Sequence, residues 1–176
     1  MTITSESAGA PESWGEVRSK TVRWHDPKVA LEAAPGRTGL EFLTAMAAGE
    51  IPGPPISGLL GMRPISAGPG DIVFVCTPDE SMYNPIGMVH GGIACTLLDS
   101  VAGCAVHTTL PAGVGYTSIE IKVNYLRPIH THTGELTAHG WVTKPGKRVA
   151  FAEADLRDAD GVLLATATSA CLIIGA

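Results

Sequence analysis

The stretch HGGIACTLLDSVAGCAVHTTL, residues 90–110, is long and almost wholly apolar. Its length favours a helix over a strand, although the β-branched end from Val106 to Thr109 is expected to fray. Apolar residues cover most of the helix circumference, at positions 93, 94, 97, 98, 101, 102, 105 and 106. A helix of this kind is buried, so the segment predicts the centre of the fold.

Strand-like segments lie on both sides of this helix. Residues 71–77, DIVFVCT, are β-branched and aromatic, and four similar segments follow at 116–126, 134–144, 148–158 and 162–174. Short turns with glycine, KPGK and DADG, join the last three, as antiparallel hairpins require. This order predicts an α+β fold in which an antiparallel sheet wraps around one long helix. Because one curved sheet is not expected to enclose the helix fully, part of its apolar surface predicts contact with a second subunit and a homo-oligomer.

The chain before the first of these strands is divided by proline and glycine. Residues 1–35 are polar and predict a poorly ordered arm, in which WHDPKVALEAA can form a short helix. Residues 37–50, RTGLEFLTAMAAGE, predict a helix capped by Thr38. Residues 51–64, IPGPPISGLLGMRP, predict a loop that leads into the main domain.

Length and composition predict one folded domain at 58–176, preceded by an arm with a short helix at 1–57. The 176 residues are 45% hydrophobic and 16% charged, which fits neither a disordered nor a collagen-like chain. A net charge of −5 without a block of lysine and arginine argues against a nucleic-acid partner.

The cysteines and the N-terminus predict the location of the chain. The four cysteines have no CxxC spacing and lie in apolar runs, which predicts free thiols in a reducing compartment. The N-terminus lacks the apolar core of a signal peptide, and no apolar run is as long as a membrane span. The chain is therefore expected to be cytoplasmic, without a membrane partner.

Gly91 and Gly92 occupy the start of the predicted helix. A helix start has unpaired backbone N–H groups and a partial positive charge, and glycine lets a ligand oxygen approach them closely. The pair can polarise a carbonyl as an oxyanion hole does, or it can simply permit a tight turn. His90 can donate to the same carbonyl, orient a neighbour or cap the helix. Asn84 can present its amide there or serve as the turn residue before Pro85.

Asp99 is the only carboxylate in this helix. Burial of an unpaired carboxylate is costly, and Thr96 and Ser100 are only partial partners. The residue is therefore either a structural hydrogen-bonding group or a general base or nucleophile in a mostly dry site. It follows Gly91 by eight residues, roughly 12 Å along a helix at about 1.5 Å per residue. If both groups act on one bond, Asp99 is expected from a second subunit.

The motif N-P-x-G-x-V-H-G-G at 84–92, the aspartate nine residues after the histidine, and the strand YTSIEIKVNYLRP together resemble the hot-dog fold acyl-CoA thioesterases. The similarity is to the phenylacetate-degradation (PaaI-like) branch and covers residues 58–175. It implies hydrolysis of an aromatic or short- to medium-chain acyl-CoA to the free acid and coenzyme A, without a metal or another cofactor. It also implies a homotetramer built from two dimers.

The resemblance implies roles for individual residues. Asp99 is the carboxylate that attacks the thioester or activates water, and the Gly91 N–H polarises the carbonyl. Asn84 and His90 match positions that support this carbonyl and the loop. Ser118 falls where some members use Ser or Thr to place the water. Asp99 and Ser118 are expected from the subunit opposite Gly91.

The role of Ser118 depends on the face of the strand from which its side chain projects. The apolar positions of its predicted strand are Ile119, Ile121 and Val123, so Ser118 alternates onto the other face. It reaches the site only if that face, or a bend at the start of the strand, meets the partner's helix.

The phosphates of coenzyme A need cations or helix-start amides. The candidate substrate-binding residues are Gly92, Arg127, Lys147 and Arg148. Lys144 lies in the same KPGKR turn as Lys147 and Arg148. Solvated surface charge is the alternative interpretation of these cations. His130 and His132 have no third ligand nearby, so no metal site is predicted.

Two other functions stay open at this point. A hot-dog hydratase or dehydratase acts on carbon two or three of a thioester and consumes it without releasing thiol. A non-catalytic acyl-CoA binding module binds the esters and leaves them intact, because a fold does not fix a function. The presence of Asp99 with the HGG helix start favours the enzyme.

Overall fold

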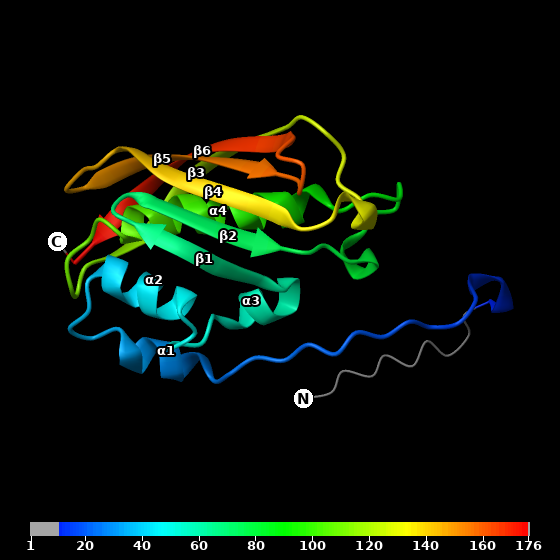
Figure 1. The fold of residues 1–176 in the computed structure, drawn as a ribbon, viewed down its shortest axis with the longest axis horizontal. Coiled ribbons are helices and arrows are strands. Elements are labelled where there is room, and N and C mark those ends of the chain that lie inside the picture. Colours follow the sequence, from blue (N-terminus) through cyan, green and yellow to red (C-terminus); the bar gives the residue numbers. More distant parts are fainter. Residues whose placement is uncertain (1–10, 176) are drawn as a thin grey trace.

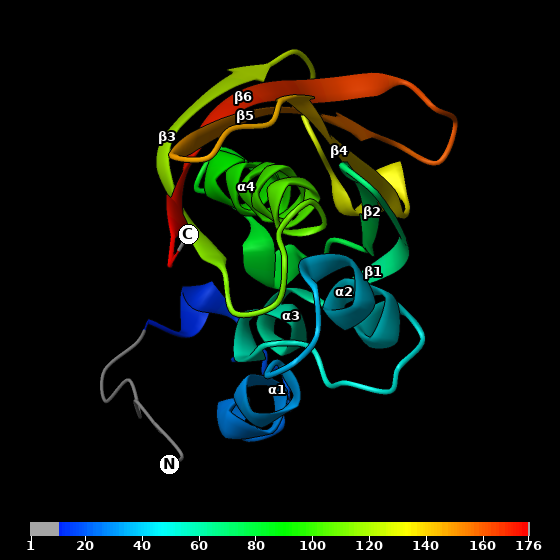
Figure 2. The same ribbon diagram turned by 90° about the vertical axis from the view of Figure 1, so that its left-hand side faces the viewer.

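The structure is a computed structural model and describes residues 11–175. The helices are α1 (Pro27–Ala33), α2 (Gly39–Ala47), α3 (Pro55–Leu60) and α4 (Gly91–His107), with short 3-10 turns η1 (Glu12–Trp14), η2 (Glu80–Met82) and η3 (Thr131–Thr133). The strands are β1 (Met62–Gly68), β2 (Asp71–Cys76), β3 (Gly115–Tyr125), β4 (Leu136–Lys144), β5 (Val149–Arg157) and β6 (Leu163–Ile174). All six strands form one antiparallel sheet in the order β1-β2-β4-β5-β6-β3. The sheet curves around α4, and α1, α2 and α3 lie on the side that it leaves open (Figure 1, Figure 2).

The predicted central helix and the five predicted strands are confirmed, and so is the α+β fold. α4 ends at His107, so Thr108 and Thr109 lie outside the helix. The helix predicted at 37–50 is α2, where the Thr38 hydroxyl accepts from Glu41 N and the Glu41 carboxylate accepts from Thr38 N. This reciprocal capping box satisfies two N–H groups at the helix start.

The loop predicted at 51–64 is wrong, because this segment contains α3 and the start of β1. Pro55 is the first residue of α3, where a missing N–H is tolerated, and Gly61 ends the helix with a φ of 64°. The prolines and glycines that predict a loop thus mark the two ends of a short helix. The predicted domain division between 57 and 58 falls inside α3, and it stays a prediction.

Small side chains let the sheet lie very close to α4. A Cβ added at Gly140 on β4 would lie 2.3 Å from the carbonyl oxygen of Val101. The inward positions of β4, β5 and β6 are largely alanines, all of them buried: Ala138, Ala150, Ala152, Ala154, Ala165 and Ala167. Larger buried side chains come from the helix, where Leu97 and Leu98 are completely buried, and from the strands at Ile72, Leu136 and Leu156.

α4 is enclosed within one chain more completely than the sequence predicts. Seven of its eight predicted apolar positions are buried, and only Ile93 is half-buried. The reason is α2, which covers the side that the sheet leaves open (Figure 2): a Cβ at Gly39 would lie 1.8 Å from the His107 carbonyl oxygen. The expectation that apolar surface of α4 is left for a second subunit is therefore wrong, and the homo-oligomer needs support from elsewhere.

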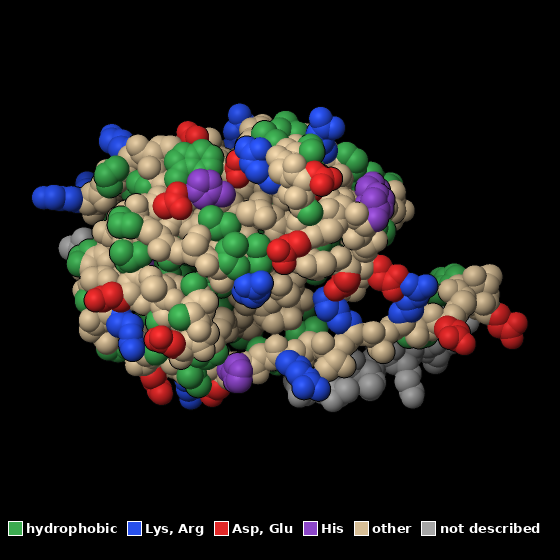
Figure 3. Space-filling model, in the orientation of Figure 1, with side chains coloured by type: hydrophobic (Ala, Val, Ile, Leu, Met, Phe, Trp, Pro, Cys, Tyr) green, Lys and Arg blue, Asp and Glu red, His purple; other side chains and the backbone are tan. Residues whose placement is uncertain are grey.

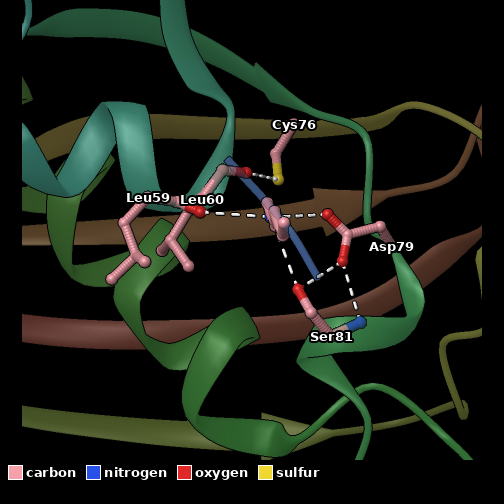
Figure 4. Close-up of polar contacts among 6 residues, drawn as sticks. Leu59, Leu60, Cys76, Asp79 and Ser81 are labelled. Carbon is pink, nitrogen blue, oxygen red and sulfur yellow. Dashed lines mark hydrogen bonds and ion pairs between the residues drawn. The ribbon is translucent and has the colours of Figure 1, made fainter. Parts of the chain in front are cut away.

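The arm predicted as poorly ordered is anchored where the structure describes it, and residues 1–10 lie outside the described residues. Arg18 pairs with Glu80, and Lys20 Nζ donates to Asp79 Oδ2 at 2.5 Å. Lys20 also donates to the carbonyl oxygen of Leu59 at 3.3 Å, so it links Leu59 near the end of α3 to Asp79 before η2; both of these partners are labelled in Figure 4. The short helix expected in this arm is confirmed as α1, whose first turn is capped by the Asp26 carboxylate.

The four cysteines are free thiols, as predicted. No helix within residues 11–175 combines the length and the apolar character needed to cross a bilayer. On the face shown in Figure 3, Lys and Arg side chains are dispersed among acidic ones, so that face carries no basic patch.

Candidate active site

His90 caps the start of α4. Its backbone is extended, and its Nδ1 accepts a hydrogen bond from Gly92 N at 2.9 Å. Because Nδ1 accepts, the ring proton of the neutral imidazole lies on Nε2. Of the roles predicted for His90, the structure shows helix capping. The Gly92 N–H predicted to bind substrate is engaged by this cap.

The Gly91 N–H is the donor that the cap leaves unpaired. No acceptor among residues 11–175 bonds to it, as expected for the first residue of a helix. Gly91 lines a pocket of about 430 Å³ together with Asn84 and Arg127. The positive end of the helix dipole also lies there. The site can therefore hold the oxygen of a polarised carbonyl, as the sequence predicts.

Asn84 shapes the loop that leads to this helix start. Its Oδ1 accepts from Ile86 N at 3.1 Å and from Met88 N at 3.3 Å, which makes it a turn residue. Its amide nitrogen keeps both N–H donors for other groups, because the backbone uses only the oxygen. The turn interpretation is therefore confirmed, and a contact of its amide with substrate stays a prediction.

Tyr125 is a site residue that the sequence reasoning missed. Its hydroxyl donates to the Gly91 carbonyl oxygen at 3.1 Å, and a Cβ on Gly91 would lie 3.2 Å from its ring. Glycine at 91 thus allows the ring to approach the helix start. Partial burial raises the pKa of Tyr125 above its ordinary value, so the hydroxyl remains a donor at neutral pH. The available signal was the alternation of Ile121, Val123 and Tyr125 on one face of β3.

Asp99 and Ser118 are brought together within one chain. Ser118 Oγ donates to Asp99 Oδ1 at 2.8 Å. A β-bulge at Ile119 makes this contact: Ser118 pairs with Cys171, whereas Glu120 pairs with the preceding residue of β6. The extra residue puts Ser118 on the same face as Ile121 and leaves Ile119 55% exposed. The structure has a bend at the strand start, one of the two conditions for the role of Ser118, and it turns Ser118 toward Asp99 of the same chain; a contact with a partner's helix stays a prediction.

Asp99 has no other partner among the described side chains. The hydroxyl of Thr96 donates to Gly92 O at 2.8 Å and that of Ser100 to Thr96 O at 2.7 Å, so neither bonds to the carboxylate. None of the ion pairs within residues 11–175 includes Asp99. The carboxylate is half-buried and held through one oxygen, which leaves the other oxygen available for water or substrate.

Asp99 and Gly91 face different pockets of the same chain. Asp99 and Ser118 line a pocket of about 340 Å³ whose other walls are mostly apolar side chains of α2, α3, β1 and β2. This pocket shares no lining residue with the one at Gly91. Gly91 and Asp99 therefore do not share a pocket within one chain, and a site completed by a second subunit stays a prediction.

The predicted phosphate-binding cations are separated within the chain. Arg127 lies beside Gly91, whereas Lys147 and Arg148 line a third pocket of about 720 Å³ beyond the C-terminal end of α4. Lys144 lies over the ring of Phe151, with its Nζ 6.0 Å from the ring centroid.

The structure also describes the two histidines that were weighed as metal ligands. The rings of His130 and His132 stack at 5.0 Å between centroids. No group of three metal-ligating side chains occurs within residues 11–175.

A sheet wrapped around one central helix, with a carboxylate on that helix and an unpaired N–H at its start, is the arrangement expected of a hot-dog thioester enzyme. The family model of the thioesterase superfamily matches residues 86–165. Human acyl-coenzyme A thioesterase 13 is 35% identical over 105 residues, which are 57% of this chain and 71% of that protein. The chain therefore belongs to the thioesterase superfamily, and the predicted resemblance is confirmed.

Solved structures agree with this assignment. A phenylacetic acid degradation-related protein from Ralstonia eutropha JMP134 has a TM-score of 0.67 at 29% identity, over 74% of this chain and 98% of that one. The E. coli PaaI protein has a TM-score of 0.68 over 78% of this chain and 96% of that one, and at 23% identity this likeness concerns the fold alone. The chain is a thioester hydrolase with a hot-dog fold.

Proposed function

We propose that the chain hydrolyses an aromatic or short- to medium-chain acyl-CoA to the free acid and coenzyme A. The observation that carries the proposal is the Ser118–Asp99 hydrogen bond together with the unpaired Gly91 N–H. The activity named for the human relative, an acyl-coenzyme A thioesterase, supports the same substrate class.

The chemistry follows from these groups. The Gly91 N–H of one subunit donates to the thioester carbonyl oxygen and stabilises the negative charge that develops there. Asp99 of a second subunit takes a proton from a water that Ser118 helps to hold, while the water oxygen bonds to the carbonyl carbon. In the other route the carboxylate attacks that carbon itself, and water later releases the acid. In both routes the C–S bond breaks and the coenzyme A thiolate leaves and takes up a proton.

An open sheet edge supports a homo-oligomer. β3 is an edge strand of 11 residues, and its Ile119 and Tyr125 are 55% and 56% exposed. A long exposed edge strand pairs readily with another chain. A second copy on this edge completes the site in the proposed dimer, and two dimers form the proposed tetramer.

The remaining proposals concern coenzyme A and location. Arg127 beside Gly91 is the proposed first contact for the phosphates, and Lys147 and Arg148 are proposed contacts from another part of the assembly. The four free thiols support a reducing, cytoplasmic location.

Thiol release from a panel of aromatic and aliphatic acyl-CoAs tests the proposal. Asp99→Asn keeps the shape of the side chain and removes its charge, and it is expected to lower kcat about 10²–10⁴-fold. Asp160→Asn, in an exposed turn, is the matched control and should keep the wild-type rate. Equal rates for the wild type and Asp99→Asn would make Asp99 structural. Substrate consumed without thiol indicates a hydratase, and tight binding without turnover indicates a binding module.

A further inference from the structure

Three aromatic side chains line one part of the pocket that contains Asp99. Ring centroids of Phe42 and His107 lie 5.9 Å apart, and those of His107 and Tyr116 lie 5.5 Å apart. All three side chains line the pocket that contains Asp99 and Ser118. His107 follows Asp99 by eight residues on α4, and Tyr116 precedes Ser118 by two residues on β3. The three aromatic side chains therefore line the part of the pocket toward the C-terminal end of α4, with His107 farthest from Asp99 along the helix and Tyr116 beside Gly103 between them.

Backbone contacts hold this end in place. A Cβ at Gly39 would lie 1.8 Å from the His107 carbonyl oxygen, and Gly39 N donates to Leu110 O at 3.1 Å. The start of α2 is thus locked against the end of α4. The ring of Tyr116 fills the space beside Gly103, where a Cβ would lie 2.5 Å from it.

The end of the pocket is apolar in character. Burial lowers the pKa of His107, so its ring is neutral at pH 7. The Tyr116 hydroxyl has one weak contact, to the Cys104 sulfur at 3.8 Å. Most of the other lining residues are apolar, namely Leu43, Met46, Pro54, Ile56, Met62 and Phe74, and Ser57 and Ser100 are the polar ones. A hydrocarbon tail fits these surroundings, and a charged group at its far end does not.

We propose that this pocket holds the acyl group and that Phe42, His107 and Tyr116 limit a straight acyl chain to about ten carbons, an inference that rests on the proposed function. The eight residues from Asp99 to His107 span about 12 Å at ~1.5 Å per residue. An extended chain advances about 1.2 Å per bond, as three backbone bonds of a protein span ~3.5 Å, so ~10 carbons fill that length. The volume of 340 Å³ is near the lower limit of the about 300–1,000 Å³ found for small-molecule sites.

The test is kcat/KM for straight-chain acyl-CoAs of four to sixteen carbons. For the wild type, each methylene beyond the limit is expected to lower kcat/KM about tenfold or more. Tyr116→Ala and Phe42→Ala each remove an end wall and should move the limit to longer chains by at least two carbons. Phe151→Ala is the matched control, because this ring is 43% exposed on β5 and lies outside the pocket. It should keep the wild-type limit.

Two results overturn the inference: a wild type that hydrolyses the longest ester as well as the medium ones, or two wall variants with an unchanged limit. Either wall variant alone suffices if the other does not fold, which circular dichroism shows. Dissociation constants of the same esters, measured with Asp99→Asn and with Asp99→Asn/Phe42→Ala, separate this inference from the proposed function. If no ester is hydrolysed, the proposed function fails. The inferred chain-length limit is then supported if the affinity of Asp99→Asn for the esters drops beyond about ten carbons and recovers in Asp99→Asn/Phe42→Ala. It is overturned if the affinity does not depend on chain length.

Discussion

Gly140 faces the backbone of α4, and its replacement by alanine tests how closely the helix lies on the sheet. The added Cβ would lie 2.3 Å from Val101 O and 2.9 Å from Ala102 N. Carbon–oxygen contacts in proteins are about 3.3–3.6 Å, so helix and sheet must separate locally by about 1 Å. Val101 and Ala102 are completely buried, so the separation loosens contacts throughout the centre of the core.

The expected loss is about 3 kcal/mol in the free energy of unfolding, at the upper end of the range for overpacked cores. In a chain of this size, 1 kcal/mol lowers Tm by about 2–4 °C, so Gly140→Ala is expected to lower Tm by about 6–12 °C. Gly115→Ala is the matched control, because nothing lies within 4 Å of its added Cβ. Its Tm should stay within about 2 °C of the wild type, as for an ordinary surface substitution.

Thermal unfolding followed by circular dichroism measures both variants, and urea unfolding gives the free energies directly. A Tm of Gly140→Ala equal to that of Gly115→Ala would refute the close contact between the sheet and α4. A loss in both variants would point instead to a general intolerance of alanine in these strands.

Three further predictions concern the site and its surroundings. Ser118→Ala removes the donor to Asp99 and is expected to lower kcat about 10-fold or more, the equivalent of ~1.4 kcal/mol for a hydrogen bond to a charged group, whereas Ser118→Thr retains activity. Burial lowers the pKa of His107, so this side chain binds a proton more readily in the unfolded protein than in the folded one. The free energy of unfolding should therefore fall as pH drops below about 6.5. Tm measured against pH should show this fall in the wild type and lose it in His107→Gln. Burial raises the pKa of the Cys76 and Cys104 thiols to about 11, so Ellman's reagent at neutral pH should modify them only after unfolding. Rapid labelling of either thiol in the native protein would contradict its burial.

The central helix and its functional groups can be predicted from the sequence because a helix has a fixed rise and a long apolar segment has one stable environment. Gly91 must then lie at its start and Asp99 about two turns further on. The cap made by His90 is less predictable, because a histidine before a helix serves donor, acceptor and core roles equally well.

Other features depend on contacts between distant segments. The bulge at Ile119 needs no special residue, so an isoleucine that looks like a core position is instead exposed, and the facing of Ser118 follows only from the strand pairing. Tyr125 takes its place at the helix start from the same pairing. α3 is difficult to predict from the sequence, because Pro55 at its start and Gly61 just after its end are typical of a loop when they are considered in isolation.

The alanine- and glycine-lined face of the sheet restricts how this enzyme can change its substrate during evolution. A larger residue at Gly140 collides with α4, and the buried alanines of β4, β5 and β6 leave little room for substitution; none of these three strands lines the proposed acyl pocket. The helices α2 and α3 are different, because their side chains Phe42, Met46 and Ile56 line the pocket and are only partly buried or exposed. New acyl preferences are therefore expected to arise by substitution in the N-terminal third of the chain, while the part that carries the reacting groups stays the same.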